Sequence, residues 1–187
     1  IREDDTWRIH ILSRDSVENA NPIDYRIRAT RDAAPSITFL SPEPSMDLDE
    51  EARVELAWRM TDDFGFSGLE LHYRLDESRF GEPSDSFFVL PLPVADTYLL
   101  DQTGTLVWQM RPDTGLDPVP GDVFTYFLQV DDNNSVSGFS SARTALYRLR
   151  MPSLAERQEN LKRLKRVLLQ HHITISPIPT PATPATL

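Results

Sequence analysis

The sequence contains no cysteine. A disulfide framework, a thiol nucleophile and a thiolate zinc site are therefore excluded. The chain also lacks any hydrophobic run as long as a membrane-spanning helix requires. An initiator methionine and a secretory signal are both missing, because Ile1 opens directly onto charged residues. We therefore expect any targeting segment to have been removed or to lie upstream.

Sequence motifs of the common enzyme classes are scarce. The serine-hydrolase pattern Gly-x-Ser-x-Gly does not occur, since residues 65–68 are one residue short of it. The four histidines have no spacing typical of a helical metal pair, and no phosphate-binding glycine loop is present. Carboxylates are so abundant that a chance pair at glycosidase separation would be uninformative. We expect a non-catalytic protein with no catalytic residues and no cofactor other than, at most, calcium.

The charge is strongly negative but unevenly distributed. The net charge is −10, whereas residues 153–172 carry five cationic and two anionic side chains. An acidic body of this kind disfavours nucleic acid and is compatible with cations. The basic segment suggests self-docking or an acidic partner, although a solvated helix face explains it slightly better.

Two stretches about 120 residues apart have the same pattern. Residues 7–28 end in Tyr-Arg-Ile-Arg and residues 124–150 end in Tyr-Arg-Leu-Arg. Each has an alternating apolar strand, a polar turn, and a second strand that begins with tyrosine. The first copy lacks the rest of a domain. We interpret residues 1–33 as the terminal β-hairpin of a preceding, truncated module in a tandem array.

Residues 34–151 have the pattern of an all-β domain. Strands are predicted at 37–40, 54–60, 69–75, 87–92, 98–100 and 106–110, followed by the closing hairpin, while 41–44 has no strand continuation. Residues 54–60 and 69–75 are expected to pair or to face each other. Seven or eight short strands with no helical pattern among them favour an antiparallel β-sandwich of immunoglobulin or fibronectin type III style. The Cys-Trp-Cys hallmark of antibody domains is missing.

A short C-terminal α-helix is predicted over residues 152–172. Ser153 and Glu156 have the spacing of a capping box. Leu154, Leu161, Leu164 and Leu168 then share one helical stripe with Val167 beside it, which suits either a coiled-coil seam or a helix lying back on the sandwich. Residues 173–187 are rich in Pro and Thr and are predicted to be an extended, disordered tail.

Asp-rich turns are the best candidates for chemistry. Alternate loops of a sandwich emerge at one end, so the turn at 62–63 and the turn at 131–134 are expected to lie close together. Their oxygens would suit calcium. The metal candidates are Asp62, Asp63, Asp131, Asp132 and Asn133. The stronger interpretation is structural, since Asp and Asn are favoured in turns without any metal.

Aromatic residues are the candidates for ligand or partner contacts. Exposed aromatic rings can stack on sugars, but Trp58, Trp108 and Tyr73 are in phase with apolar neighbours, so core packing explains them better. Phe127 and Phe139 are out of that phase and are predicted to make surface or interdomain contacts.

Two segments resemble a known family. Residues 61–74 read Thr-Asp-Asp-Phe-Gly-Phe-Ser-Gly-Leu-Glu-Leu-His-Tyr-Arg, and residues 121–138 contain a Tyr-Phe strand followed by an Asp-Asp-Asn-Asn turn. Both resemble the Ig-like region of large membrane-anchored bacterial proteins of unknown function, the DUF4175 type, found in Bacteroidota and relatives. Residues 151–156 match the Met-Pro-Ser-Leu-x-Glu step that leads into a helical region in that family.

The resemblance covers residues 35–165 and implies an envelope location and a non-catalytic module. It transfers no active-site residues. The family continues through a long charged helix, whereas this chain breaks after Gln170 into a Pro-Thr-Ala tail.

Together these observations predict a binding or spacer module of a bacterial extracytoplasmic protein, in the cell envelope or secreted. A carbohydrate-binding module of a polysaccharide-degrading system and a calcium-stiffened adhesin repeat are the alternatives. The expected partner is a protein or a polysaccharide, with a neighbouring Ig-like module in the parent chain. Self-association through the first hairpin or the helix is also open, because the unpaired edge of the hairpin needs a cover.

Overall fold

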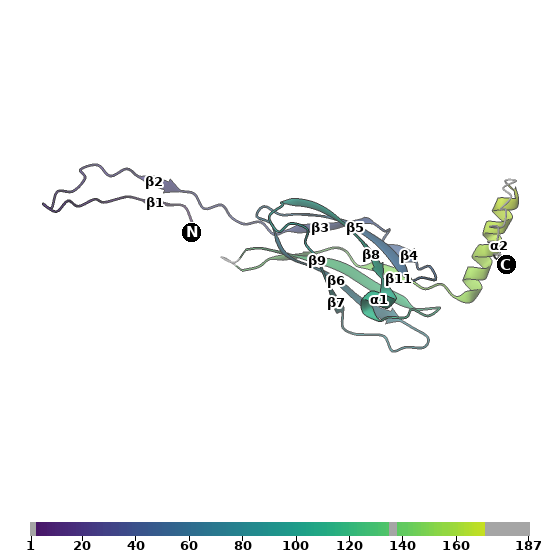
Figure 1. Ribbon diagram of the computed structural model, residues 1–187. Coiled ribbons are helices and arrows are strands. Elements are labelled where there is room, and N and C mark those ends of the chain that lie inside the picture. Colours follow the sequence, from purple (N-terminus) through teal and green to yellow (C-terminus); the bar gives the residue numbers. More distant parts are fainter. Residues whose placement is uncertain (1–2, 135–137, 171–187) are drawn as a thin grey trace, which may run out of the picture.

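A computed structural model of the chain describes residues 3–134 and 138–170. These residues form a mostly β structure with a C-terminal helix (Figure 1). The predicted tail and the last two residues of the predicted helical segment lie outside the described residues. The elements in chain order are β1 (Asp5–Trp7), β2 (Tyr25–Ile27), β3 (Ser36–Ser41), β4 (Ser45–Asp47), β5 (Arg53–Thr61), β6 (Phe66–Glu77), β7 (Phe88–Leu92), β8 (Asp101–Gln109), α1 (Met110–Thr114), β9 (Val123–Asp132), β10 (Ser141–Arg143), β11 (Tyr147–Arg150) and α2 (Leu154–Gln170).

Strands β3 to β11 form two sheets, which we call the two-sheet body. One sheet has the order β4-β11-β9-β6-β7, and β10 also pairs with β9. The other has the order β3-β5-β8. The pair β4–β11 is parallel, and every other pair in the two sheets is antiparallel. Strands β5 and β6 therefore lie in different sheets. The sequence predicted that they either pair or face each other, and they face each other.

The core is built from the alternating apolar residues of both sheets. Along β5 the side chains at 54, 56, 58 and 60 are buried, and the intervening ones point outward or lie half-buried. Trp108 of β8 is fully buried, with ring centroids 5.5 Å from Tyr73 on β6 and 5.8 Å from Tyr126 on β9. These contacts join the two sheets through one hydrophobic cluster, whose burial is the main stabilising contribution.

Strand β9 is buried on both faces, which corrects the prediction that Phe127 is a surface residue. Phe127 is only 5% exposed although it points away from the main core. His72 stacks on its ring at 4.6 Å, and Phe87 packs against it edge-on at 5.0 Å. The segment that leads into β7 therefore covers the outer face of this central strand, and periodicity alone could not foresee that cover.

Three local features differ from the sequence prediction. Strand β4 was not predicted, because it is only three residues long and is held by β11 rather than by its own pattern. The predicted strand at 98–100 is wrong. There the backbone of Tyr98 donates to Asp96 Oδ1 and the Gln102 side chain donates to the Leu99 carbonyl, so the chain bends before β8. The short helix α1 was also not predicted.

The parallel pair β4–β11 joins the beginning of the body to its end. Arg148 N donates to the Pro44 carbonyl and Leu48 N donates to the Arg150 carbonyl, each at 2.8 Å. The Arg150 guanidinium adds a two-pronged contact to Asp47, at 2.9 and 3.1 Å.

The N-terminal hairpin projects from one end of the two-sheet body (Figure 1). Its strands β1 and β2 pair antiparallel over three residues each, with Trp7 opposite Tyr25. The two rings stack with centroids 4.7 Å apart. The predicted pairing is confirmed, but the regular ladder is much shorter than the alternating sequence pattern.

Helix α2 begins with the predicted capping box and projects from the other end of the body (Figure 1). Glu156 N donates to Ser153 Oγ at 3.2 Å, and Ser153 N donates to Glu156 Oε2 at 2.8 Å. The helix does not lie back on the sheets, because four apolar side chains of the predicted stripe are exposed: Leu154, Leu161, Leu164 and Val167.

The capping box makes the start of α2 sensitive to acid. Its hydrogen bonds with Ser153, and then Arg150, lower the pKa of Glu156 from 4.5 to about 2. A depressed carboxyl pKa stabilises the folded form above the unfolded pKa, and that contribution disappears as the pH falls from 4.5 towards 2. We expect circular dichroism to show helix loss across this window, and Glu156→Gln to reduce the helicity at neutral pH. The exposed residue Glu159 supplies the control, since Glu159→Gln should retain the wild-type acid transition.

Candidate functional site

Two Asp-rich loops meet at one end of the two-sheet body, as the sequence predicts. The β5–β6 loop contains Asp62 and Asp63, and the β9–β10 loop follows Asp132, the last residue of β9. Asn133 joins them, since its side chain donates to the Phe64 carbonyl at 2.8 Å and its backbone N donates to the Gly65 carbonyl at 3.2 Å. The loops are therefore held together by direct hydrogen bonds.

One Asp at each loop has a structural role. Asp62 Oδ2 accepts hydrogen bonds from the backbone N–H groups of Phe64 and Gly65, at 3.0 and 2.8 Å. Asp132 Oδ1 likewise accepts from the backbone of Asn134 and Ser140, at 3.2 and 3.0 Å. This is the turn-forming role of Asp that the sequence favoured. It uses one oxygen of each carboxylate.

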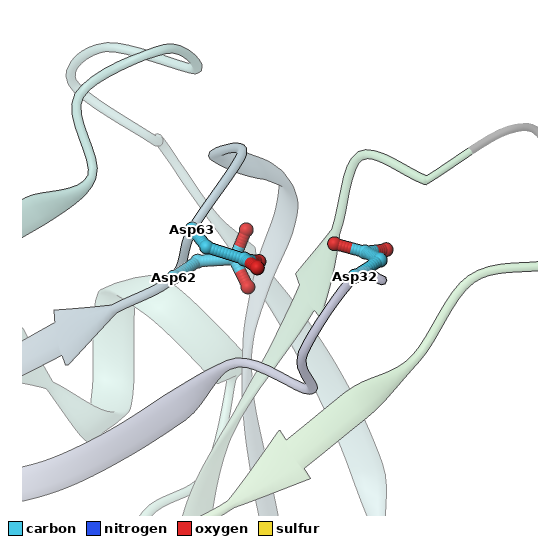
Figure 2. Close-up of side chains that lie close together, drawn as sticks. All are labelled: Asp32, Asp62 and Asp63. Atoms are coloured by element: carbon cyan, nitrogen blue, oxygen red, sulfur yellow. The ribbon is translucent and has the colours of Figure 1, made fainter. Parts of the chain in front are cut away.

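A third segment, the linker between the hairpin and β3, brings Asp32 to the same place. One carboxylate oxygen from each of Asp32, Asp62 and Asp63 lies within 4.8 Å of the other two. Figure 2 shows Asp62 and Asp63 on one loop, with Asp63 pointing toward Asp32 on the facing segment. The backbone N–H of Ala33 also donates to the Asp63 carboxylate, at 3.2 and 3.3 Å.

Asp32 was missed by sequence reasoning, although a usable signal exists. Ser36 pairs with Thr61 in the antiparallel β3–β5 ladder. In an antiparallel pair the residues before one strand run beside the residues after the other. The linker before Ser36 must therefore pass the loop after Thr61. Asp32 has no distinctive sequence context of its own. Its position beside the loop can be predicted only once the β3–β5 register is known.

Four carboxylate oxygens in this region are buried and have no well-formed hydrogen bond among the described residues, although the Asn134 side chain lies close enough to stabilise the Asp32 carboxylate. They are Asp32 Oδ1, Asp32 Oδ2, Asp62 Oδ1 and Asp132 Oδ2. Burial raises the pKa of Asp32, and the neighbouring carboxylates of Asp63 and Asp132 raise it further, while the Asn134 amide acts in the opposite direction. The site is thus an anionic cluster that lacks full compensation from the described residues.

Two of the predicted metal residues are used elsewhere. Asp131 Oδ1 accepts from the Ser141 hydroxyl at 2.6 Å and from the Gln129 amide at 3.4 Å, so it serves the β9–β10 pair. Asn133 uses its side-chain amide to bridge the two loops. The structure therefore brings Asp62 and Asp63 together with Asp32, places Asp132 near them, and leaves Asp131 outside the three-residue group.

The aromatic candidates are mostly closed off from solvent. Trp58 and Trp108 lie in the core, at 5% and 0% exposure, which confirms the packing interpretation and removes them as ligand-stacking residues. Phe127 is buried as well. Phe139 alone of the four is exposed, as predicted, at 67%.

The opposite end of the body has a shallow open pocket beside the start of α2. Its lining mixes both charges, including Glu77, Arg79, Arg150 and Glu156. Arg150 is already paired with Asp47 and Glu156, and Glu77 with Arg148, so most of the charged lining is used within the protein. No helix within the described ranges is long and apolar enough to cross a bilayer.

Comparisons with known proteins assign no family. No protein-family model matches the chain, and no curated protein matches it either.

The acidic loop depends on a glycine that no other residue can replace easily. Gly65 has φ +108°, and a Cβ built there would overlap the Thr97 carbonyl oxygen. Gly138 has nearly the same φ, +105°, but open space around it. We expect Gly65→Ala to destabilise the fold by about 1–3 kcal/mol more than Gly138→Ala, because only the first adds a steric clash to the backbone strain. Chemical denaturation of both variants measures the difference, and equal effects would show that the loop can shift.

Proposed function

We propose that this chain is a non-catalytic spacer module of an extracytoplasmic bacterial protein, one unit of a tandem array of immunoglobulin or fibronectin type III-like β-sandwiches. The proposal has three supports: the repeated hairpin, the order of the strands, and the placement of the two chain ends.

The repeated hairpin is the observation that carries the proposal. Trp7 lies opposite Tyr25 in the β1–β2 pair, and Tyr126 lies opposite Tyr147 in the β9–β11 pair. Thr6 opposite Arg26 likewise corresponds to Thr125 opposite Arg148. The likeness between the two segments thus extends from the sequence to the register of pairing. A shared register is what two copies of one closing hairpin would have.

The exposure of the first copy indicates what it is missing. In β9 the inward side chains Tyr126, Leu128 and Val130 are fully buried. Their counterparts by register are Trp7, Ile9 and Ile11, which are 46%, 47% and 63% exposed. An apolar face of this kind is expected to be covered by the remaining strands of a preceding module. Self-association through this face would be the other way to cover it.

The strand order supports the sandwich type. If the strands are lettered as in immunoglobulin domains, β3, β5 and β8 take the places of A, B and E in one sheet. Strands β6, β9 and β11 then take the places of C, F and G in the other. These are the neighbours expected in immunoglobulin-like sandwiches. The resemblance of residues 35–165 to Ig-like regions of bacterial envelope proteins favours the same type and an extracytoplasmic location.

The chain ends suit a spacer. The hairpin leaves one end of the body and α2 leaves the other (Figure 1). A module with this layout adds length between its neighbours when it is repeated. The carbohydrate-binding alternative is less favoured, because three of its four aromatic candidates are buried.

Matched substitutions at corresponding positions of the two hairpins test whether the first hairpin is a separate copy. Trp7→Ala should leave the melting temperature of the body within about 2 °C of wild type, whereas Tyr126→Ala should cost about 3–5 kcal/mol of unfolding free energy. Thermal and urea melts of the full chain measure both. A large effect of Trp7→Ala would show that the hairpin belongs to the body and would contradict the proposal.

The reading frame upstream of Ile1 in the parent gene gives a second check. The proposal expects about 70–90 residues with alternating strand patterns there, enough to complete a sandwich of about 100 residues. A stop codon close upstream, or a helical or low-complexity sequence, would overturn the tandem array.

A further inference from the structure

We propose that Asp32, Asp62, Asp63 and Asp132 form a calcium-binding site that clamps the hairpin linker to the two-sheet body. The binding itself does not depend on the proposed function. Its consequence, a stiffer junction between modules, rests on the spacer role.

The donor set fits calcium. The site offers carboxylate oxygens only, without histidine or cysteine, and hard divalent cations prefer such ligands. Calcium binds six to eight oxygens at about 2.3–2.6 Å, so donors around one ion lie within about 5 Å of each other. The three clustered oxygens are within 4.8 Å. They come from two separate loop segments, which suits the flexible geometry of calcium better than the strict octahedron of magnesium.

The burial of Asp132 is an independent sign of a ligand. Its side chain is fully buried, and Oδ2 has no donor among the described residues although Oδ1 has two. Asp132 also lies near enough to Asp32 to repel it electrostatically. A buried carboxylate oxygen without a hydrogen-bond donor loses hydration without compensation, unless a cation supplies it.

The protein itself supplies no such cation among its described residues. Arginine side chains pair with exposed carboxylates elsewhere, for example Arg59 with Asp101 and Arg148 with Glu77. None of the four cluster residues takes part in an ion pair with a described Lys, Arg or His. The chain has 19 Lys and Arg side chains, yet none of the described ones neutralises this cluster. An external cation would supply the missing positive charge.

The position of Asp32 determines what a bound ion would connect. Asp32 lies on the linker, whereas Asp62 and Asp63 lie on the β5–β6 loop (Figure 2) and Asp132 is the last residue of β9. An ion bound by all four would therefore connect the hairpin segment to the body. In a tandem array this contact would restrict bending between successive modules.

The first experiment measures binding with CaCl₂. Calorimetry of the full chain should show one ion per chain, and saturating calcium should raise the melting temperature by about 5 °C over chelator at constant ionic strength. Equal shifts with CaCl₂ and MgCl₂ would mean that the negative charge of the chain is merely screened. Either that result or the absence of any shift would overturn the site.

The key variant is Asp32→Asn, because it removes a charge while one side-chain oxygen remains to accept the Asn134 amide. It should abolish most of the calcium-induced shift. In chelator it should melt at or above the wild-type temperature, since the repulsion within the cluster is relieved. The control Asp85→Asn changes an exposed carboxylate outside the cluster by the same charge and should keep the full calcium response. A control that loses the response equally, or a key variant that keeps it, would contradict the assignment.

A second measurement separates binding from stiffening. The absence of cysteine allows spin labels to be placed at Asn21→Cys in the hairpin and Thr105→Cys on β8, both exposed. Electron-resonance distance distributions should narrow when CaCl₂ replaces chelator. Binding without narrowing would leave the calcium site standing and overturn its junction role, whereas narrowing that Asp32→Asn abolishes would support both.

Discussion

The burial of β9 on both faces is the constraint on which the other parts of the structure depend. Its inner side chain Tyr126 packs against Trp108 of the opposite sheet at 5.8 Å, and Phe39 and Tyr147 surround the same ring. Its outer side chain Phe127 lies under His72 and Phe87. A strand enclosed in this way cannot slip by one residue, because a slip would exchange its inner and outer side chains.

The fixed register of β9 also determines where the chemistry can occur. Asp132 is the last residue of the strand, so the register of β9 fixes the position of its carboxylate beside the loops at this end of the body. Phe66 pairs with Asp132 across the β6–β9 ladder, which brings the loop before β6 to the same level. The acidic cluster is thus a product of sheet register, and the three segments that supply it lie 30 to 100 residues apart in the sequence.

The parts of this arrangement that the sequence could predict are those with a local signal. The alternation in β5 and β6, the capping box at Ser153 and the closeness of the two Asp-rich turns depend on neighbours in the chain or on a general rule for sandwich loops. The burial of Phe127 could not be predicted, because it depends on a cover from the segment before β7. The role of Asp32 was hidden for a related reason, since only the β3–β5 register places it beside Asp63.

The parallel pairing of β4 with β11 has a mechanical consequence. Strand β4 follows β3 and strand β11 precedes α2, so a pull on the chain ends that reaches β4 draws these parallel neighbours in opposite directions along their length. The hydrogen bonds at Leu48 and Arg148, and the contact of Arg150 with Asp47, then carry the load together in shear and do not open one at a time. This shear-resistant contact lies at the edge of the larger sheet, away from the acidic loops.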